Sequence, residues 1–433
     1  MQAPAGRYAY PAYLIGFFLC AVACYAGMYA LGYFSRLPTA DDLLRWDAGF
    51  YHAIMQDGYA YTPGVQGNAG FYPLFGYFWR LTGLGAVGIS VVNVVVYLLS
   101  LYAACRLLRP RPVTLALFMA LPFVFFFYLP FSESLFLLFS VGILYGFARD
   151  RPRLLFAAVL LAGLTRPTAL FLVPTLVGAT LMGRPREEIL AADTWRRIAA
   201  CYLLPSLLAF LVVALVQYVQ VGDAMAYYKL QSAVWGRKFG LPVFPLHGDV
   251  DNWILLLRSL NLWVGALAAS IGLYYLIRWL TPAGIAGRIR PLALLAVIYL
   301  TMCLISIVFF NPAWHWINDG GYNSTILTGI NRYVQANGFL LVFMVYVFEW
   351  KTPRWWHLPV LLAGTYLLLF TIEPGYYKHI RRTLHISWIT AIAALYWAYY
   401  FLRWAPLGYA LAAVSLTYQC RMMQGALTGS QVD

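Results

Sequence analysis

The sequence has few charged residues. They make up 11% of the 433 positions, whereas a soluble globular domain has roughly one-quarter. Hydrophobic residues make up 62%. This composition excludes an ordinary soluble protein and predicts an all-α polytopic membrane protein.

Cysteine and histidine are also sparse, and neither forms a metal-binding or disulfide pattern. The six cysteines include no C-x-x-C pair, and the six histidines no H-E-x-x-H motif. His315 and Asp319 lie four residues apart and could share a helix face, so a metal pair there stays open. The sequence predicts no cofactor and no metal site; a divalent metal is neither indicated nor excluded.

Acidic residues are fewer than basic ones, which gives a net charge of +14. In a soluble chain this excess would suggest nucleic acid. Here the basic residues gather in short, alternate connections between apolar segments, as the positive-inside rule predicts for cytoplasmic loops. The charge therefore reports topology, and the expected partner is the lipid bilayer, not nucleic acid. The clusters lie at residues 106–111, 149–153, 184–197, 278–290 and 351–354.

Long apolar segments occur throughout the chain, and a membrane-spanning helix needs about 20 such residues. Met1–Tyr10 shows no cleavable signal, so we expect the first span to be retained. With no internal repeat or soluble segment, we expect one domain over residues 1–433 with about 11–13 membrane helices. The clearer spans are Pro11–Phe34, Gly85–Ala104, Val113–Leu129, Leu135–Phe147, Cys201–Gln220, Leu262–Leu280, Leu292–Phe310, Tyr333–Trp350 and Pro359–Ile372.

The first outer loop, Ser35–Leu84, contains the most chemically varied segment, LRWDAGFYHAIMQDGY. Thr39 and Asp42 form a capping-box pattern that predicts an amphipathic helix from this point. Its apolar face would hold Leu43, Trp46, Phe50 and Ile54, with Asp47 and Tyr51 on the other face. Asp47 lies among aromatic residues where membrane and water meet. It is either a site residue or part of an interfacial aromatic anchor.

Two further charged residues are functional candidates. Arg166, in Thr165-Arg166-Pro167, separates the apolar stretches Leu154–Leu164 and Thr168–Met182, which are too short to span and predict a broken or re-entrant hairpin. An arginine at membrane depth needs a partner or a wet cavity. It could also cap the broken helix ends. Glu133, in an outer turn, could bind an acceptor or orient Arg166, or it could be a solvated turn carboxylate.

The polar residues concentrate in the outer loops and not midway along the spans. A transporter would place ionisable residues or broken helices near the midplane, and only the break at Arg166 fits that pattern. An enzyme at the outer surface fits better. Its substrate would be bulky, lipid-linked and carbohydrate-like, because aromatic rings pack on sugars while Asn, Gln and Asp hydrogen-bond them.

Several blocks resemble, in order, motifs of the PIG-V family, the GPI mannosyltransferase II class and its prokaryotic relatives. RWDAGFYHAIMQDGY is similar to R-W-D-x-x-x-Y-x-x-I-x-x-x-G-Y, and FYPLFGYFWRL to F-F-P-L-Y-P. YLPFSESLFLLFSVG and LAGLTRPTALFLVP resemble the Y-S-E-S-L-F and L-T-R-P-T-G blocks. GDAMAYYKLQSAVWGR resembles G-D-P-x-A-F-x-x-x-Q-x-x-W, and GINRYVQANGFLL resembles the R-Y block. The resemblance covers residues 40–345. Phe75-Gly76 and Ala169 depart from the pattern, and the tail after 350 resembles no block.

The resemblance implies a GT-C type membrane glycosyltransferase that transfers mannose from a polyprenyl- or dolichyl-phosphate sugar donor. Asp47 would be the catalytic base, and a hydroxyl of a glycolipid, glycan or protein acceptor would attack with inversion. Residues 1–220 would form a catalytic-loop half and 221–433 a more variable substrate-binding half. The donor phosphate would meet Arg332, Tyr333 and Arg166. The substrate-binding candidates are Arg45, Trp46, Tyr51, His52, Tyr59, Tyr72, Glu133, Gln231 and Trp235.

The expected location is the bacterial inner membrane with the site facing the periplasm or exterior, or the endoplasmic reticulum with a luminal site in a eukaryote. A lipid-linked glycan transporter or flippase is the alternative. It would move lipid without forming a glycosidic bond.

Overall fold

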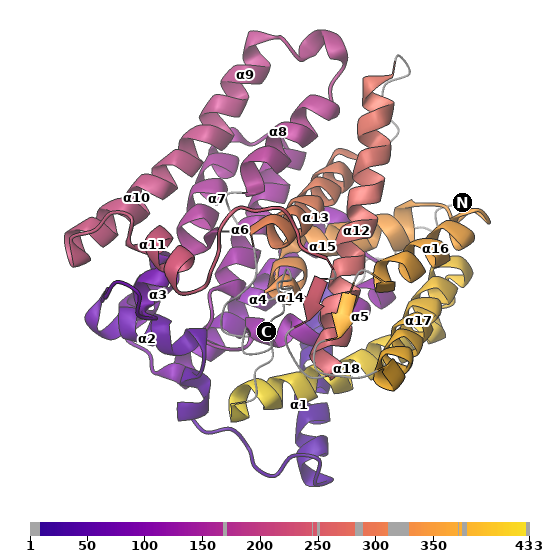
Figure 1. Ribbon diagram of the computed structural model, residues 1–433, viewed down its shortest axis with the longest axis horizontal. Coiled ribbons are helices and arrows are strands. Elements are labelled where there is room, and N and C mark those ends of the chain that lie inside the picture. The colour runs from indigo at the N-terminus through magenta and orange to yellow at the C-terminus, as the bar shows by residue number, and fades with distance from the viewer. Residues whose placement is uncertain are drawn as a thin grey trace.

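The computed structural model describes residues 9–167, 171–244, 246–248, 252–281, 289–310, 329–370, 372–374 and 379–429 (Figure 1). This part of the chain is helical apart from two short strands, β1 (Leu246–Gly248) and β2 (Ile372–Pro374). The strands pair in parallel, with Leu246 opposite Ile372. His315, Asp319 and most of the third outer loop lie outside the described residues.

The N-terminal part forms a series of helices that alternates long and short elements. The expected span Val113–Leu129 is wrong as a single helix, because the chain breaks between α5 and η3. Pro122 starts η3 and cannot continue a helix from α5, since it has no N–H to donate. The elements are α1 (Tyr10–Ala30), η1 (Asp41–Leu44), α2 (Asp47–Asp57), η2 (Asn68–Gly70), α3 (Pro73–Thr82), α4 (Ala86–Leu108), α5 (Pro112–Met119), η3 (Pro122–Phe127), α6 (Glu133–Ala148), α7 (Pro152–Thr165) and α8 (Leu172–Met182).

The C-terminal part contains a second broken span. The expected helix Tyr333–Trp350 is interrupted after Gln335 and starts again at Gly338, where Asn337 caps it by accepting the Leu340 N–H at 3.0 Å. The elements are η5 (Arg186–Glu188), α9 (Ala192–Ile198), η6 (Ala199–Leu203), α10 (Leu204–Val221), α11 (Ala226–Ala233), α12 (Asn252–Leu280), α13 (Pro291–Phe310), α14 (Ile330–Gln335), α15 (Gly338–Val345), η8 (Tyr346–Trp350), α16 (His357–Phe370), α17 (His379–Leu402) and α18 (Ala405–Thr428).

Five helices in the described residues are long and apolar enough to cross a membrane, as expected for a multi-pass membrane protein. They are Tyr10–Ala30, Ala86–Leu108, Ala192–Val221, Leu260–Leu280 and Pro291–Phe310. Five shorter apolar helices accompany them, at Glu133–Ala148, Pro152–Thr165, Leu172–Met182, Gly338–Trp350 and Thr390–Leu402. The total of 11–13 membrane helices stays a prediction.

The predicted break at Arg166 is confirmed: α7 ends at Thr165, and Arg166 is extended, with φ −154° and ψ 150°. Helices α6 and α7 pack closely side by side. A Cβ at Gly146 would lie 2.9 Å from Leu155. Because the short connection at Arg149–Arg151 joins one end of this pair, Glu133 and Arg166 both lie at the other end.

The expected single helix after Thr39 is wrong, and its N-cap is Ala40 and not Thr39, although the reciprocal hydrogen bonds of the predicted capping box are present. The Thr39 N–H donates to Asp42 at 2.8 Å, and the Asp42 N–H points back to the Thr39 hydroxyl at 3.4 Å. The first helical turn is then only η1, which ends at Leu44. Helix α2 starts afresh at Asp47 and buries Ala48, Tyr51 and Ile54 rather than Trp46 and Phe50. Figure 1 shows α2 beside α3, where Ile54 fills the space over a glycine of α3.

The C-terminal helix α18 packs against α1, α5 and η3. Gln419 donates to the backbone oxygens of Met119 and Leu121, at 3.1 and 2.9 Å. Both carbonyls lie at the break between α5 and η3, and that of Leu121 also accepts the backbone N–H of Val124 at 3.1 Å. Helix α18 belongs to the part of the chain that resembles no family block. It nevertheless donates hydrogen bonds to the backbone at the break that precedes Glu133.

Candidate active site

Asp47 lies at a sharp backbone turn. Trp46, just before it, has φ 57° and ψ −135°, a conformation that costs free energy for a residue with a side chain. The Trp46 indole N–H donates to the Ala426 carbonyl oxygen of α18 at 2.9 Å. This contact holds the turn and places Asp47 at the first position of α2, where a helix favours negative charge.

Glu133 starts α6 and is fully buried. Asn93 of α4 holds the preceding turn by donating to the Leu129 and Phe131 carbonyl oxygens, at 2.5 and 3.0 Å. The alternative of a solvated turn carboxylate is therefore wrong. A buried carboxylate needs charged or hydrogen-bonding partners, and the structure supplies two arginines.

Arg332, on α14, joins the two carboxylates. Its Nε and Nη2 atoms lie 2.7 and 2.5 Å from Glu133 Oε1, and its Nη1 donates to Asp47 Oδ2 at 2.5 Å. The guanidinium also lies over the rings of Phe126 and Phe131, with centroid distances of 4.9 and 5.4 Å. All three nitrogen atoms of the Arg332 guanidinium are therefore in contact with a carboxylate oxygen.

Arg166 reaches the same carboxylate from the break after α7. Its Nη1 lies 2.7 Å from Glu133 Oε1, although not in hydrogen-bonding geometry. We call Asp47, Glu133, Arg166 and Arg332 the charge cluster. Its formal charges balance to zero, since two carboxylates face two guanidinium groups. The sequence separation between Asp47 and Arg332 is 285 residues, so only the fold brings them together.

The two carboxylates of the charge cluster have different surroundings. The Asp47 side chain is 25% exposed and pairs with Arg332, whereas the Glu133 side chain is 0% exposed and faces both arginines through Oε1. Glu133 Oε2 is buried and has no hydrogen-bond partner among the described residues. Asp47 can therefore meet a substrate and exchange a proton, while Glu133 is suited to hold the arginines.

Two predicted site residues border the charge cluster. The Tyr51 hydroxyl, one turn after Asp47, donates to the Ser132 hydroxyl at 3.0 Å, next to Glu133. The Tyr333 hydroxyl accepts a hydrogen bond from Arg237 Nη1 at 2.9 Å. Arg237 was not among the sequence candidates. Its position at the end of GDAMAYYKLQSAVWGR, a block that resembles the family, was the available signal.

The other sequence candidates lie outside the charge cluster and have structural partners. Arg45 contacts Asp42 at 3.2 Å, Trp46 holds Ala426, and His52 packs on Trp79. The Tyr59 hydroxyl donates to the Phe71 carbonyl at 2.8 Å, and Tyr72 packs on Tyr227. Gln231 donates to the Gly70 carbonyl at 3.1 Å, and Trp235 fills the space where a Cβ on Gly70 would lie, 2.4 Å away.

Asp42 forms a separate ionic brace at the edge of the first loop. Arg36 donates to both of its carboxylate oxygens, at 2.5 and 2.9 Å, and the Thr39 backbone N–H donates to one of them. These hydrogen bonds hold the pKa of Asp42 well below its usual range, and the one from Arg36 has the largest effect. The brace fixes the segment that leads into Asp47.

In the described part of the chain, no three His, Cys, Asp or Glu side chains gather as metal ligands would. The charge cluster can instead supply one accessible base and two cations, which is what displacement of a phosphate leaving group requires. Comparison of the chain with family models, with curated proteins and with solved structures found no match.

Proposed function

We propose that this protein is a membrane glycosyltransferase of the GT-C type. It would transfer a sugar, which the motif resemblance suggests is mannose, from a polyprenyl- or dolichyl-phosphate donor to an acceptor hydroxyl. The reaction would take place on the extracytoplasmic side. The observation that supports this most is the charge cluster. It brings together candidate residues from four separate blocks that resemble the PIG-V family.

The proposed reaction is a single displacement with inversion. The acceptor oxygen forms a bond to the anomeric carbon as the bond from that carbon to the lipid phosphate breaks. Asp47 accepts the acceptor's proton, because it is the more exposed carboxylate of the two. The lipid monophosphate leaves with the bonding electron pair and is stabilised by a guanidinium.

The geometry adds a link between these two events. While Asp47 is ionised it neutralises part of Arg332, with a contact of 2.5 Å. When Asp47 takes the acceptor's proton, the charge cluster changes from neutral to a net charge of +1. This positive charge develops beside Arg332 as negative charge develops on the departing phosphate. Interactions that strengthen in the transition state are those that accelerate a reaction.

The direct test uses purified protein in liposomes, with polyprenyl-phosphate mannose and a lipid extract as acceptor source, and mass spectrometry of the products. We expect a new mannosylated product and free polyprenyl phosphate in equal amounts. A parallel assay follows a fluorescent lipid-linked sugar across the bilayer. Transbilayer movement without a new glycosidic bond would contradict the proposal and support the flippase alternative, which the break at Arg166 favours.

A further inference from the structure

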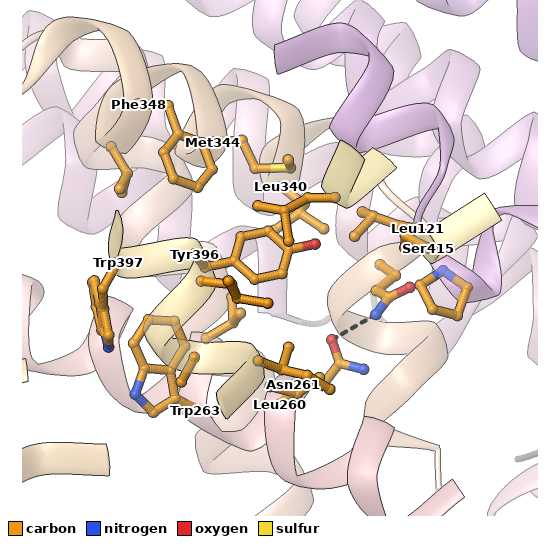
Figure 2. Close-up of a pocket in the computed structure, with 18 of the residues that line it drawn as sticks. Leu121, Leu260, Asn261, Trp263, Leu340, Met344, Phe348, Tyr396, Trp397 and Ser415 are labelled. Atoms are coloured by element: carbon orange, nitrogen blue, oxygen red, sulfur yellow. Dashed lines mark hydrogen bonds between the residues drawn. The ribbon is translucent and has the colours of Figure 1, made fainter. Parts of the chain in front are cut away.

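A second site candidate lies away from the carboxylates, in a cavity of about 430 Å³ between α12, α15, α17 and α18 (Figure 2). Leu121 and Pro122, at the break before η3, close one side. Ligand-binding cavities in proteins typically hold roughly 300–1,000 Å³. The space is therefore large enough for a segment of a ligand, and nothing in the proposed chemistry uses it.

The lining is almost entirely apolar and aromatic. Figure 2 shows Trp263 and Trp397 together at the left, Tyr396 in the middle, and Leu121 with Ser415 at the right. The polar exceptions include an amide pair, Asn261 and Gln335, in which Gln335 Nε2 donates to Asn261 Oδ1 at 3.0 Å. Such a cavity suits a hydrocarbon ligand whose polar end lies on the side of the amide pair.

The amide pair connects the cavity to the charge cluster. Asn261 Nδ2 donates to Asn331 Oδ1 at 2.7 Å, and Gln335 Oε1 accepts the backbone N–H of Phe123 at 3.1 Å. Asn331 and Gln335 both lie on the six-residue helix α14, which also carries Arg332. Gln335, on the polar side of the cavity, and Arg332, the candidate ligand of the donor phosphate, therefore lie on the same short helix.

We propose that this cavity holds the first part of the isoprenoid chain of a polyprenyl phosphate, with its phosphate directed to Arg332. The assignment rests on the proposed function. A single unsaturated, methyl-branched chain matches a lining that offers aromatic faces and branched aliphatic side chains but few polar groups. The amide pair then marks the level at which the hydrocarbon gives way to the charged headgroup.

Two alanines on α18 provide a matched pair of variants. Both alanines are exposed, but Ala410 lines the cavity and Ala413, three residues further along the same helix, does not. Ala410→Phe should fill part of the cavity, and Ala413→Phe adds the same ring outside it. Ala393→Phe, at a lining residue on α17, repeats the test from a second helix.

The measurement is binding of sugar-free polyprenyl phosphate to the full chain in nanodiscs, followed by tryptophan fluorescence, since Trp263 and Trp397 line the cavity. Keeping two or three methylene-sized groups out of an apolar site should weaken binding on the order of 10–50-fold. We expect this loss for Ala410→Phe and Ala393→Phe and none for Ala413→Phe. In the wild type, affinity should rise with each added isoprene unit until the cavity is full.

Unchanged affinity in both cavity variants would overturn the assignment, as would equal binding of phosphatidic acid, which carries the same phosphate on two acyl chains. Because the probe carries no sugar, the result is separable from the proposed transfer reaction. Specific chain-length-dependent binding without any transfer would overturn the proposed function alone. Transfer that is unaffected by Ala410→Phe and Ala393→Phe would overturn the cavity assignment alone.

Discussion

Replacing Glu133 by glutamine tests whether the charge cluster is a buried ionic network. The amide keeps the shape of the side chain but removes the charge that two guanidiniums share through Oε1, at 2.5–2.7 Å. Breaking a buried pair by removing one partner costs about 3–5 kcal/mol, because the remaining charge is left uncompensated. We expect Glu133→Gln to lose at least about 3 kcal/mol of unfolding free energy.

A double-mutant cycle with Arg166→Met separates this effect from loss of shape. In the Glu133→Gln variant the two arginines lack their carboxylate partner, and Arg166→Met removes one of these uncompensated cations. The double variant should therefore lose less unfolding free energy than the sum of the two single losses, by roughly 1–3 kcal/mol. The assay is denaturant titration of the detergent-solubilised chain, monitored by circular dichroism. The exposed pair Asp193 and Arg196, 3.3 Å apart, provides the control, and its removal should have no measurable effect.

A loss below about 1 kcal/mol in Glu133→Gln, or a cycle without coupling, would refute this reasoning, since neither is compatible with a buried network. It would also remove the argument that Glu133 holds the arginines in place for the proposed reaction.

Three further predictions concern the surroundings of Asp47. Arg332→Lys should be nearly as harmful as Arg332→Ala and should lower kcat/KM for the lipid donor on the order of 100-fold. The reason is that one ammonium group cannot reproduce the three contacts that the planar guanidinium makes. Steady-state kinetics in which Arg332→Lys keeps most of the wild-type kcat/KM would contradict this. Trp46→Phe loses the 2.9 Å bond to Ala426 and should lower kcat several-fold with an unchanged donor KM, whereas an unchanged kcat would show that the turn needs no such support. Because the pKa of Asp42 is lowered in the folded chain, its stabilising effect is complete above about pH 4 and is lost as the pH falls further. The difference in thermal midpoint between wild type and Asp42→Asn should therefore shrink on acidification from pH 7 to 3, and a constant difference would contradict the assignment.

Local sequence patterns predicted the features that depend on neighbouring residues. The Thr39–Asp42 capping pattern, the break at Arg166 and several long apolar helices all follow from short-range chemistry, and the structure contains them. The helix phase after Thr39 was wrong because the unusual turn at Trp46 separates η1 from α2. Its tether comes from Ala426, 380 residues away, so no local pattern could reveal it.

The pairing of charges was also beyond local reasoning. Asp47, Glu133 and Arg332 could be named as candidates one by one, but no local pattern indicated that Arg332 bridges the two carboxylates. The break at Pro122 was missed because its flanking residues are uniformly apolar. The break at Asn337 was missed although Gln335 and Gly338 lie beside it in the sequence. At the first of these breaks, Gln419 of α18 donates hydrogen bonds to two backbone carbonyl oxygens. No sequence motif had suggested a role for this helix.

The central claim is that Asp47 is the base of a glycosyl transfer, and its direct measurement compares Asp47→Asn with Asp57→Asn in a single-turnover assay with polyprenyl-phosphate mannose. Asp57 is the control because it is an exposed carboxylate at the other end of the same helix, α2. We expect Asp47→Asn to fold normally and to lose on the order of 10²–10⁴-fold in the rate of transfer, as removal of a general base does. Asp57→Asn should keep the wild-type rate. A near-normal rate in Asp47→Asn would contradict the account and leave Asp47 as a structural partner of Arg332.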